Sequence, residues 1–280
     1  MNVNNMPTPT DINSLQDLAT IVLDWEHRLS EPMLGLPTFW FRGHADASWE
    51  LKPTVLRSWF TTWLAARRFH ASCDPDEDLE ANEMTFNREF RRMAASFHLA
   101  GDSDVELYFL QQHHGMPTRL LDWSRNAMAA LFFAVSDYDD RDGQLFVMDP
   151  RRTLPAIPGV PMDVVHARHP IVENTVKYLY EGSPSSPNPY TPPGSPYVVP
   201  VSPDLRAGRL LQQDACFTLH MPRSLPLQVM APAIESYRVP SSRKEELRFV
   251  LRSMGMGYAH AYADLDNVSK DIRTAWKLYP

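Results

Sequence analysis

The segment from Gln111 to Asp122 constrains this 280-residue chain more than any other. Two amides, two imidazoles, a guanidinium and a carboxylate stand within these twelve residues. Apolar runs over residues 107–110 and 127–135 flank the segment on either side. Polar groups framed in this way are held beside the hydrophobic core, where each must find a hydrogen-bonding partner. The chain therefore has to fold around one polar site.

Apolar periodicity predicts helices and strands in an irregular order. The expected helices cover residues 15–29, 79–98, 104–113, 126–135 and 242–254, with a short last helix over 269–279. The expected strands cover residues 38–43, 144–148, 217–221 and 234–239, and residues 49–57 form a second strand or a turn. Because this order lacks the strict βαβ alternation of a doubly wound sheet, the expected fold class is α+β with a small mixed sheet.

Three helix starts carry capping signals. Ser14 and Asp17 resemble a capping box, and Ser242 with Glu245 forms another one. Asp104 is expected as the N-cap of its own helix.

The chain is expected to form one domain over residues 13–280, preceded by a flexible tail over residues 1–12. Residues 181–203 contain eight of the 25 prolines. Proline lacks the backbone donor that helices and strands need, so this stretch is expected to be a long surface loop.

Charge and composition exclude several classes of protein. A net charge of -7 argues against broad, nonspecific binding to duplex nucleic acid, which needs a basic surface. Met1 to Asp11 lacks the apolar region of a secretory signal, and no stretch approaches the ~18 apolar residues of a membrane span. Cys73 and Cys216 are enough for one disulfide bridge, but no secretory context indicates it. We expect a cytoplasmic protein without a membrane partner.

Familiar cofactor motifs are absent from the sequence. There is no GxxxxGK[ST] phosphate loop, no strand-linked GxGxxG, no HExxH and no CxxC. Gly255-Met256-Gly257 is better explained as the end of a helix, and no metal is expected.

Arg42 follows Phe39-Trp40-Phe41 at the end of an apolar strand. Burying a guanidinium is costly unless anions or carbonyl groups accept its hydrogen bonds. An internal carboxylate such as Asp122 or a bound anion can do so, and the sequence leaves both open. Arg119 competes for Asp122, which leaves one positive charge for a phosphate. We therefore expect Arg42, Arg119 and Asp122 in one cleft, beside a helix N-terminus that is capped by Asp122 or Ser124 and favours an anion.

Three segments together resemble the FRG domain family, which is named for the tripeptide found here at Phe41-Arg42-Gly43. The central Gln-His-x-Gly-x-Pro-Thr-Arg-Leu-Leu-Asp-Trp block is nearly complete from Gln112 to Trp123. His44 and Ala215 stand where the family usually has Gln and Gly. The later segment is matched at Arg209, Gln213, Phe217 and Thr218.

The first motif is also similar to that of Arg-Ser-Glu ADP-ribosyltransferases. This resemblance implies an NAD-consuming enzyme, acting as a toxin or phage-defence effector on protein, RNA or DNA, with an antitoxin or other regulatory partner. The roles that it implies directly fall on Arg42, Thr218 and Glu235, and the remaining assignments come from the chemistry of the residues. Catalytic roles fall on Arg42, His114, Arg119, Asp122, Thr218, His220 and Glu235. Nucleotide-binding roles fall on Arg42, Gly43, Trp49, Gln213 and Phe217.

Two other functions stay open from the residues alone. In the first, the arginines recognise phosphate in a noncatalytic module that binds a nucleotide or nucleic acid. In the second, His114 and Asp122 hydrolyse a phosphoester or glycosidic bond. Release of nicotinamide from NAD distinguishes the enzyme from the binding module.

Overall fold

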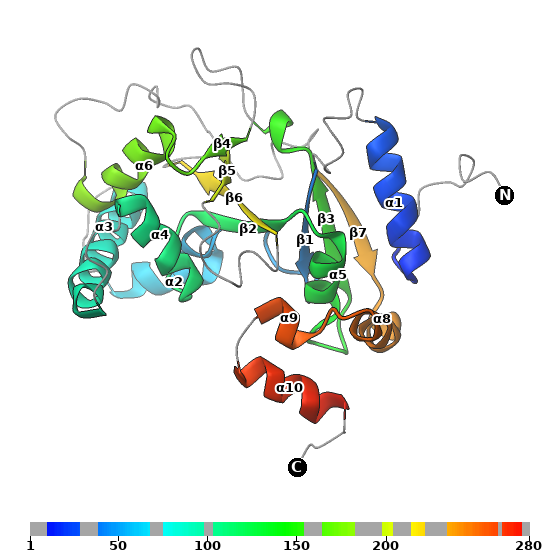
Figure 1. Cartoon of the computed structure of the whole chain (residues 1–280). Coiled ribbons are helices and arrows are strands. Elements are labelled where there is room, and N and C mark those ends of the chain that lie inside the picture. The colour runs from blue at the N-terminus through cyan, green and yellow to red at the C-terminus, as the bar shows by residue number, and fades with distance from the viewer. Residues whose placement is uncertain are drawn as a thin grey trace.

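The computed structural model describes residues 10–28, 39–67, 75–97, 103–153, 164–182, 198–203, 214–221, 234–262 and 265–275. Within these ranges, seven strands form one sheet in the order β4-β5-β6-β2-β1-β3-β7 (Figure 1). Neighbouring strands are antiparallel except β4 and β5, which are parallel. The strands are β1 (Trp40–His44), β2 (Leu120–Ser124), β3 (Gly143–Met148), β4 (Val165–His166), β5 (Val198–Ser202), β6 (Ala215–His220) and β7 (Ile234–Val239).

Helices surround this mixed sheet, so the fold is α+β as expected. The helices of the described ranges are α1 (Leu15–Arg28), α2 (Ser58–Arg67), α3 (Pro75–Ala94), α4 (Asp104–His113), α5 (Ala127–Val135), α6 (Pro170–Glu181), α8 (Ser241–Ser253), α9 (Tyr258–Tyr262) and α10 (Leu265–Ala275). Short 3₁₀ turns lie at Thr54–Leu56, Ala95–Phe97 and Pro150–Arg152. None of these helices is both long enough and apolar enough to cross a membrane.

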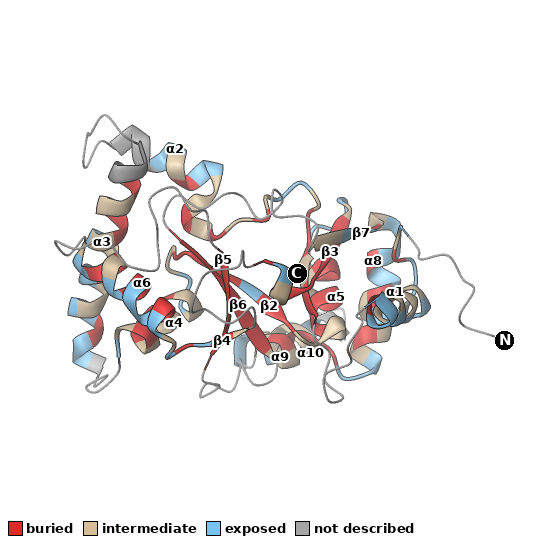
Figure 2. Cartoon of the chain, turned by 90° about the horizontal axis from the view of Figure 1, so that it is seen from above, coloured by how far each residue is buried: buried red, intermediate tan, exposed pale blue. Residues whose placement is uncertain are grey.

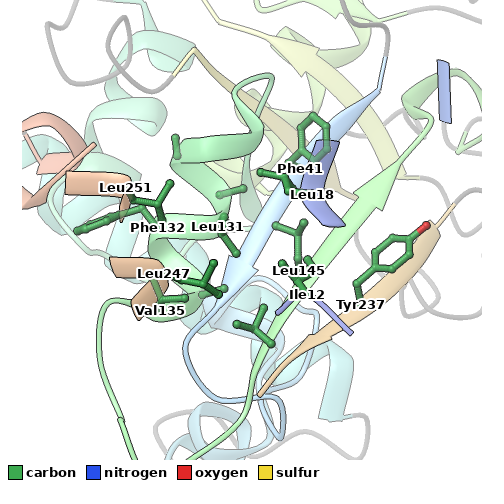
Figure 3. Packing of buried hydrophobic residues seen from close by; sticks show 14 of the residues in the cluster. Ile12, Leu18, Phe41, Leu131, Phe132, Val135, Leu145, Tyr237, Leu247 and Leu251 are labelled. Carbon is green, nitrogen blue, oxygen red and sulfur yellow. The ribbon is translucent and has the colours of Figure 1, made fainter. Parts of the chain in front are cut away.

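One core lies between strands β1, β3 and β7 and helices α1, α5 and α8 (Figure 3). Helix α5 is almost wholly apolar because it lies at the centre of this core, where Leu131 and Val135 are fully buried. Figure 3 shows Leu247 and Leu251 of α8 beside α5 and Phe41 of β1 on its other side. Burial of this apolar surface stabilises the half of the sheet that carries β1.

A second core lies between strands β5 and β6 and helices α4 and α6. In Figure 2 the buried residues follow the strands and the inward faces of these helices. Phe217, Leu219 and Met221 alternate along β6 and its end and all enter this core. The alternation predicted from the sequence is therefore confirmed. Thr218 and His220, expected on the other face, are also buried.

The sheet opens between β1 and β2. These strands pair at one position, Phe41 with Ser124, whereas β1 and β3 pair at five positions from Trp40 to His44. Strand β2 is fully paired with β6 on its other side. The two strands therefore diverge beyond Phe41, and Arg42 lies where they separate.

Most of the expected elements are confirmed, and the boundaries need correction. The Ser14–Asp17 capping box exists, with the Asp17 amide donating to the Ser14 hydroxyl at 3.3 Å. Asp104 is the first residue of α4 rather than its cap, because Ser103 forms a capping box with Glu106. Helix α8 begins at Ser241, whose amide donates to Asp142 at 2.8 Å, so the expected cap at Ser242 is wrong.

The loop expected over residues 181–203 is wrong at its end. Residues 198–202 form the buried strand β5, and residues 183–197 lie outside the described residues. Pro200 is tolerated because β4 pairs with β5 only at Val201 and Ser202, which leaves no ladder bond to be lost at Pro200 on that side. Residues 49–57 contain a 3₁₀ turn and no strand.

Candidate functional site

Arg42 occupies the gap between β1 and β2. Its Nη1 donates to the backbone carbonyl of Asp122 at 2.6 Å, and its Nε donates to Nε2 of His44 at 3.0 Å. The Asp122 carboxylate lies 3.8 Å from Nη1. The guanidinium thus replaces the strand pairing that is missing at Asp122. This structural task alone does not need a charge, because a carbonyl and a neutral imidazole accept its bonds.

A cleft of about 380 Å³ opens at this gap, and we call it the β1–β2 cleft. Its polar walls are Arg42, Gln112, His113, Asp122, Ser124, Ser136 and Asp137. Its aromatic walls are Phe41, Trp49, Phe109, Trp123, Phe133, Phe217 and Tyr262. A few charged groups among many aromatic rings is the usual composition of a small-molecule site.

The Asp122 side chain is half-exposed, with 54% of its surface accessible, whereas the Arg42 side chain is only 14% accessible. Gln112 of α4 donates to Asp122 Oδ2 at 2.8 Å, and the Thr118 hydroxyl donates to the Gln112 amide oxygen. The order of bonds fixes the rotation of the Gln112 amide, since its oxygen accepts and its nitrogen donates. The dense central segment therefore serves to orient one carboxylate toward the cleft.

Positive charge exceeds negative charge around Arg42. Burial lowers the pKa of Arg42 to about 10, while Asp122 raises it and Arg57 lowers it further. The guanidinium still keeps its charge at neutral pH. Arg57 is also close enough to Asp122 for the carboxylate to raise its pKa against burial. Glu50 also raises the pKa of Arg57 and pairs with Lys52 at 2.8 Å, so the two carboxylates of Asp122 and Glu50 face the three cations Arg42, Arg57 and Lys52.

Two buried histidines stay neutral beside these cations. Burial lowers the pKa of His44 to about 2, with further contributions from Arg42 and Arg57. Burial lowers the pKa of His220 to about 3, with Arg119 and Arg42 adding to the effect. Because Nε2 of His44 accepts from Arg42, its proton is assigned to Nδ1.

Arg119 does not join Arg42 in the cleft, and its expected pairing with Asp122 is wrong. Its Nε donates to both carboxylate oxygens of Glu83 at 2.9 Å, and Nη1 donates to the carbonyl of Met221 at 3.2 Å. The two side chains are only 2% and 3% accessible. Glu83 lies on α3, far away in the sequence, and no spacing pattern indicated it. The charge expected from Arg119 near Asp122 comes from Arg57 instead.

Of the predicted site residues on β6, one lines the cleft and two do not. Phe217 lines the β1–β2 cleft. Thr218 is buried, accepts from Trp123 Nε1 at 3.1 Å and lies 3.2 Å from Nε2 of His220. Neither Thr218 nor His220 lines the cleft. Gln213 lies outside the described residues.

Glu235 lies on β7, two strands from β1, and does not line the cleft. Arg28 donates to its Oε2 at 2.9 Å and Tyr237 donates to the same oxygen at 2.7 Å. The hydrogen bond from Arg28 lowers the pKa of Glu235. The Glu235 carboxylate therefore links α1, through Arg28, to the edge strand β7.

Trp49 and Gly43 line the cleft as expected, while His114 is exposed outside it and His113 lines it instead. The helix N-terminus expected to favour a phosphate belongs to α5. It is capped by Asn126, whose side chain accepts from the amides of Met128 and Ala129 at 2.9 and 3.2 Å. Neither Asp122 nor Ser124 caps it, and because the Asn126 side chain already accepts from two of its first amides, those amides do not serve an anion.

Sequence reasoning missed the far wall of the cleft. Ser136 and Asp137 follow α5 and Tyr262 ends α9, and only the fold brings them to β1. No motif marked them, because isolated polar residues after a helix look like an ordinary turn. In the described part of the chain, no three His, Cys, Asp or Glu side chains come together as a metal site requires.

Comparison with known proteins gives one family match. Residues 37–143 match the family model of the FRG domain, so this stretch of the chain is an FRG domain. The match contains β1, β2, α5 and most of the β1–β2 cleft. No curated protein and no solved structure matches the chain.

Proposed function

We propose that this FRG-domain protein binds an anionic nucleotide in the β1–β2 cleft and acts as an NAD-dependent ADP-ribosyltransferase-like enzyme. The observation that carries the proposal is the position of Arg42, a nearly buried cation facing the cleft beside a half-exposed carboxylate. Its hydrogen-bond partners, a carbonyl and an imidazole, are neutral, and the Asp122 carboxylate at 3.8 Å also interacts with Arg57, so the positive charge of Arg42 is only partly compensated. A pyrophosphate balances that charge, and planar guanidinium donors suit phosphate oxygens.

The aromatic walls favour a ligand that carries flat rings. Trp49 is 40% exposed and follows β1, whereas Phe217 lies on β6, and both line the cleft with Arg42. A flat ring of the ligand stacks on the exposed Trp49 while a charged group binds elsewhere, and Phe217, only 2% exposed, closes the wall. NAD offers two rings joined by a pyrophosphate, which is why we take it as the first candidate.

Asp122 is the carboxylate that we assign to the chemical step in place of Glu235. In that step the bond between ribose C1′ and the nicotinamide nitrogen breaks, and its electron pair leaves with nicotinamide. The Asp122 carboxylate stabilises the oxocarbenium ion that develops at C1′. An acceptor hydroxyl or amine, or water, then forms the new bond to C1′ and releases its proton to Asp122 or to solvent.

The experiment is an assay of nicotinamide release from NAD, followed by chromatography. We expect release by the wild type and a loss of at least about a hundredfold in kcat for Asp122→Asn, with NAD affinity changed less than about threefold. Asp140→Asn is the matched control, because Asp140 is 81% exposed and does not line the cleft. Equal kcat for Asp122→Asn and the wild type would remove Asp122 from the mechanism.

One observation favours a noncatalytic nucleotide-binding module as the second candidate. Glu235, the glutamate that the transferase resemblance implied, is held by Arg28 outside the cleft. Binding of NAD without any release of nicotinamide supports this module. The hydrolase that used His114 with Asp122 has no comparable support, since His114 lies outside the cleft. A toxin or phage-defence role, and a macromolecular acceptor, follow only if turnover is observed.

A further inference from the structure

Lys244 of α8 is a fully buried lysine with three backbone acceptors. Its Nζ donates to the carbonyl of Ala45 at 2.6 Å and to those of Asp137 and Tyr138 at 2.9 Å each. A lysine ammonium has three donors, and these three bonds use all of them. Lys244 therefore ties the end of β1 to the segment that follows α5.

Both tied segments belong to the wall of the β1–β2 cleft. Ala45 and Asp137 line it directly. Tyr138 has a φ of 55°, a left-handed conformation that is costly for an aromatic residue. Its ring meets the ring of Trp49 edge to face at 5.5 Å, and Trp49 lines the cleft. A strained residue persists where its surroundings hold it, and Lys244 holds the carbonyl of this one.

Two more C-terminal helices hold the same segment. The Tyr258 hydroxyl of α9 donates to the carbonyl of Ser136, and Nζ of Lys270 of α10 lies 3.3 Å from Asp137 Oδ1. Figure 1 shows α8, α9 and α10 gathered on the side of α5 away from α6. All three lie beyond residue 143, where the FRG match ends.

A lysine is an expensive choice for this position. Burial lowers the pKa of Lys244, with Asp139, Asp46 and Asp142 opposing the effect and Arg248 adding to it. A side chain of similar length without a charge, such as methionine, fills the same space without desolvating an ammonium. What methionine cannot do is hold three carbonyl groups from two separate segments.

We propose that Lys244 is a positioning residue that fixes residues 136–138 and Ala45 as one wall of the β1–β2 cleft. The C-terminal helices thus complete a site whose reactive residues lie within the FRG match. That the wall serves nucleotide binding rests on the proposed function, whereas its dependence on Lys244 does not.

Hydrogen–deuterium exchange of the 280-residue chain tests the proposal, with Lys244→Met as the variant. We expect amides of residues 136–141 to exchange at least about tenfold faster, while those of β6 change less than about twofold. Arg243→Met is the control on the same helix, since Arg243 is exposed and pairs with Glu246 of α8 at 3.0 Å. Leu179→Ala, at a buried residue of α6 that does not line the cleft, serves as a variant of comparable stability loss.

NAD affinity in the same variants provides the second readout. We expect Lys244→Met to bind NAD at least about tenfold more weakly than the wild type, and Leu179→Ala to bind it as the wild type does. Exchange over residues 136–141 that is unchanged, or raised equally in Leu179→Ala, overturns the proposal. If the wild type binds no NAD, the proposed function fails while the exchange result still decides the role of Lys244.

A folded-state check keeps the test decisive. Should Lys244→Met not fold, Lys270→Gln takes its place, because the partly exposed Lys270 of α10 contacts Asp137 in the same segment. We expect that variant to raise exchange over residues 136–138 about threefold without loss of the far-ultraviolet circular dichroism signal. No increase in exchange in that folded variant would contradict the proposal that the C-terminal helices fix residues 136–138.

Discussion

Gly43 lies where the backbone of β1 meets helix α5, and this contact explains why a glycine is needed there. A Cβ at this position would lie 1.9 Å from the carbonyl oxygen of Ala130 and 2.7 Å from the amide of Ala134. Both neighbours are helix backbone, which cannot move aside cheaply. Gly43 also lines the cleft, as the sequence predicted, but packing alone already requires it.

We therefore expect Gly43→Ala to destabilise the fold by at least about 3 kcal/mol, at the upper end of overpacking costs. Chemical denaturation measures it. Gly115→Ala is the comparison, because Gly115 has a φ of 75° and no atom lies within 4 Å of the place that a Cβ would take, so only backbone strain of about 1–2 kcal/mol applies. Equal losses in the two variants would show that the close approach of α5 is not the reason for Gly43.

Several of the sequence-assigned residues that line the cleft stand next to apolar runs. Arg42, Asp122 and Phe217 stand beside or within strands, so periodicity indicated which side chains are held near the core. Glu235 was placed wrongly for the proposed chemistry because its partner, Arg28, comes from a helix 207 residues away in sequence. Pairings over such distances are decided by the fold and leave no local pattern.

At the scale of elements, the buried pair of Arg119 and Glu83 joins α3 to the start of β2. Strand β2 itself was not predicted, because Leu-Leu-Asp-Trp-Ser does not alternate between apolar and polar residues. The structure gives the reason, since β2 is central and mostly buried on both faces. Helices α2 and α6 were also missed. Helix α6 follows the imidazole of His169, which caps it by accepting from the Ile171 amide at 3.3 Å.

We expect Glu83→Ala to cost about 3–5 kcal/mol of folding free energy, because it leaves the Arg119 guanidinium buried without its partner. Replacing both residues by methionine should recover most of that loss, since neither charge then remains to be desolvated. Urea denaturation of the single and double variants measures both effects. Glu89→Ala, on the exposed face of α3, should leave stability nearly unchanged, because its pair with Arg92 is exposed to solvent. A double variant as unstable as Glu83→Ala would mean that packing, and not charge, is lost.

At the scale of the whole molecule, the two buried imidazoles make stability depend on pH. The pKa values of His44 and His220 fall from 6.5 to about 2 and about 3 in the fold. Between about pH 6.5 and pH 3 the unfolded chain therefore binds more protons than the folded chain. The contribution of both residues is fully present above about pH 6.5 and is lost as the pH falls through this window.

We expect each imidazole to remove about 2 kcal/mol of stability between about pH 7.5 and pH 5, from about 1.36 kcal/mol per pH unit below the unfolded pKa. Urea denaturation at the two pH values measures the sum. His220→Gln should roughly halve the contribution that the pair makes to this pH dependence. A pH dependence that is the same in that variant and in the wild type would show that His220 titrates normally in the fold.

The fold class and the positions of Arg42 and Asp122 beside the core followed from the sequence. The full set of segments that form the cleft walls did not. Its walls come from β1, β2, α4, the segment after α5 and the end of α9, so they span the chain from Phe41 to Tyr262. The FRG match covers the first part of this set and ends before the helices that hold the far wall. Only tertiary packing joins the cleft walls inside the FRG match to the C-terminal helices that hold the far wall.

Calorimetric titration of NAD into the wild type and Arg42→Ala tests most directly the claim that Arg42 anchors a nucleotide. A charge-assisted hydrogen bond contributes roughly 1.5–3 kcal/mol, so we expect Arg42→Ala to bind NAD at least about tenfold more weakly. Arg42→Lys should recover little of the affinity, because lysine lacks the planar fork. Arg243→Ala, on the exposed face of α8, should bind as the wild type does. Unchanged affinity in a folded Arg42→Ala variant would contradict the account and leave Arg42 as a link between β1 and β2.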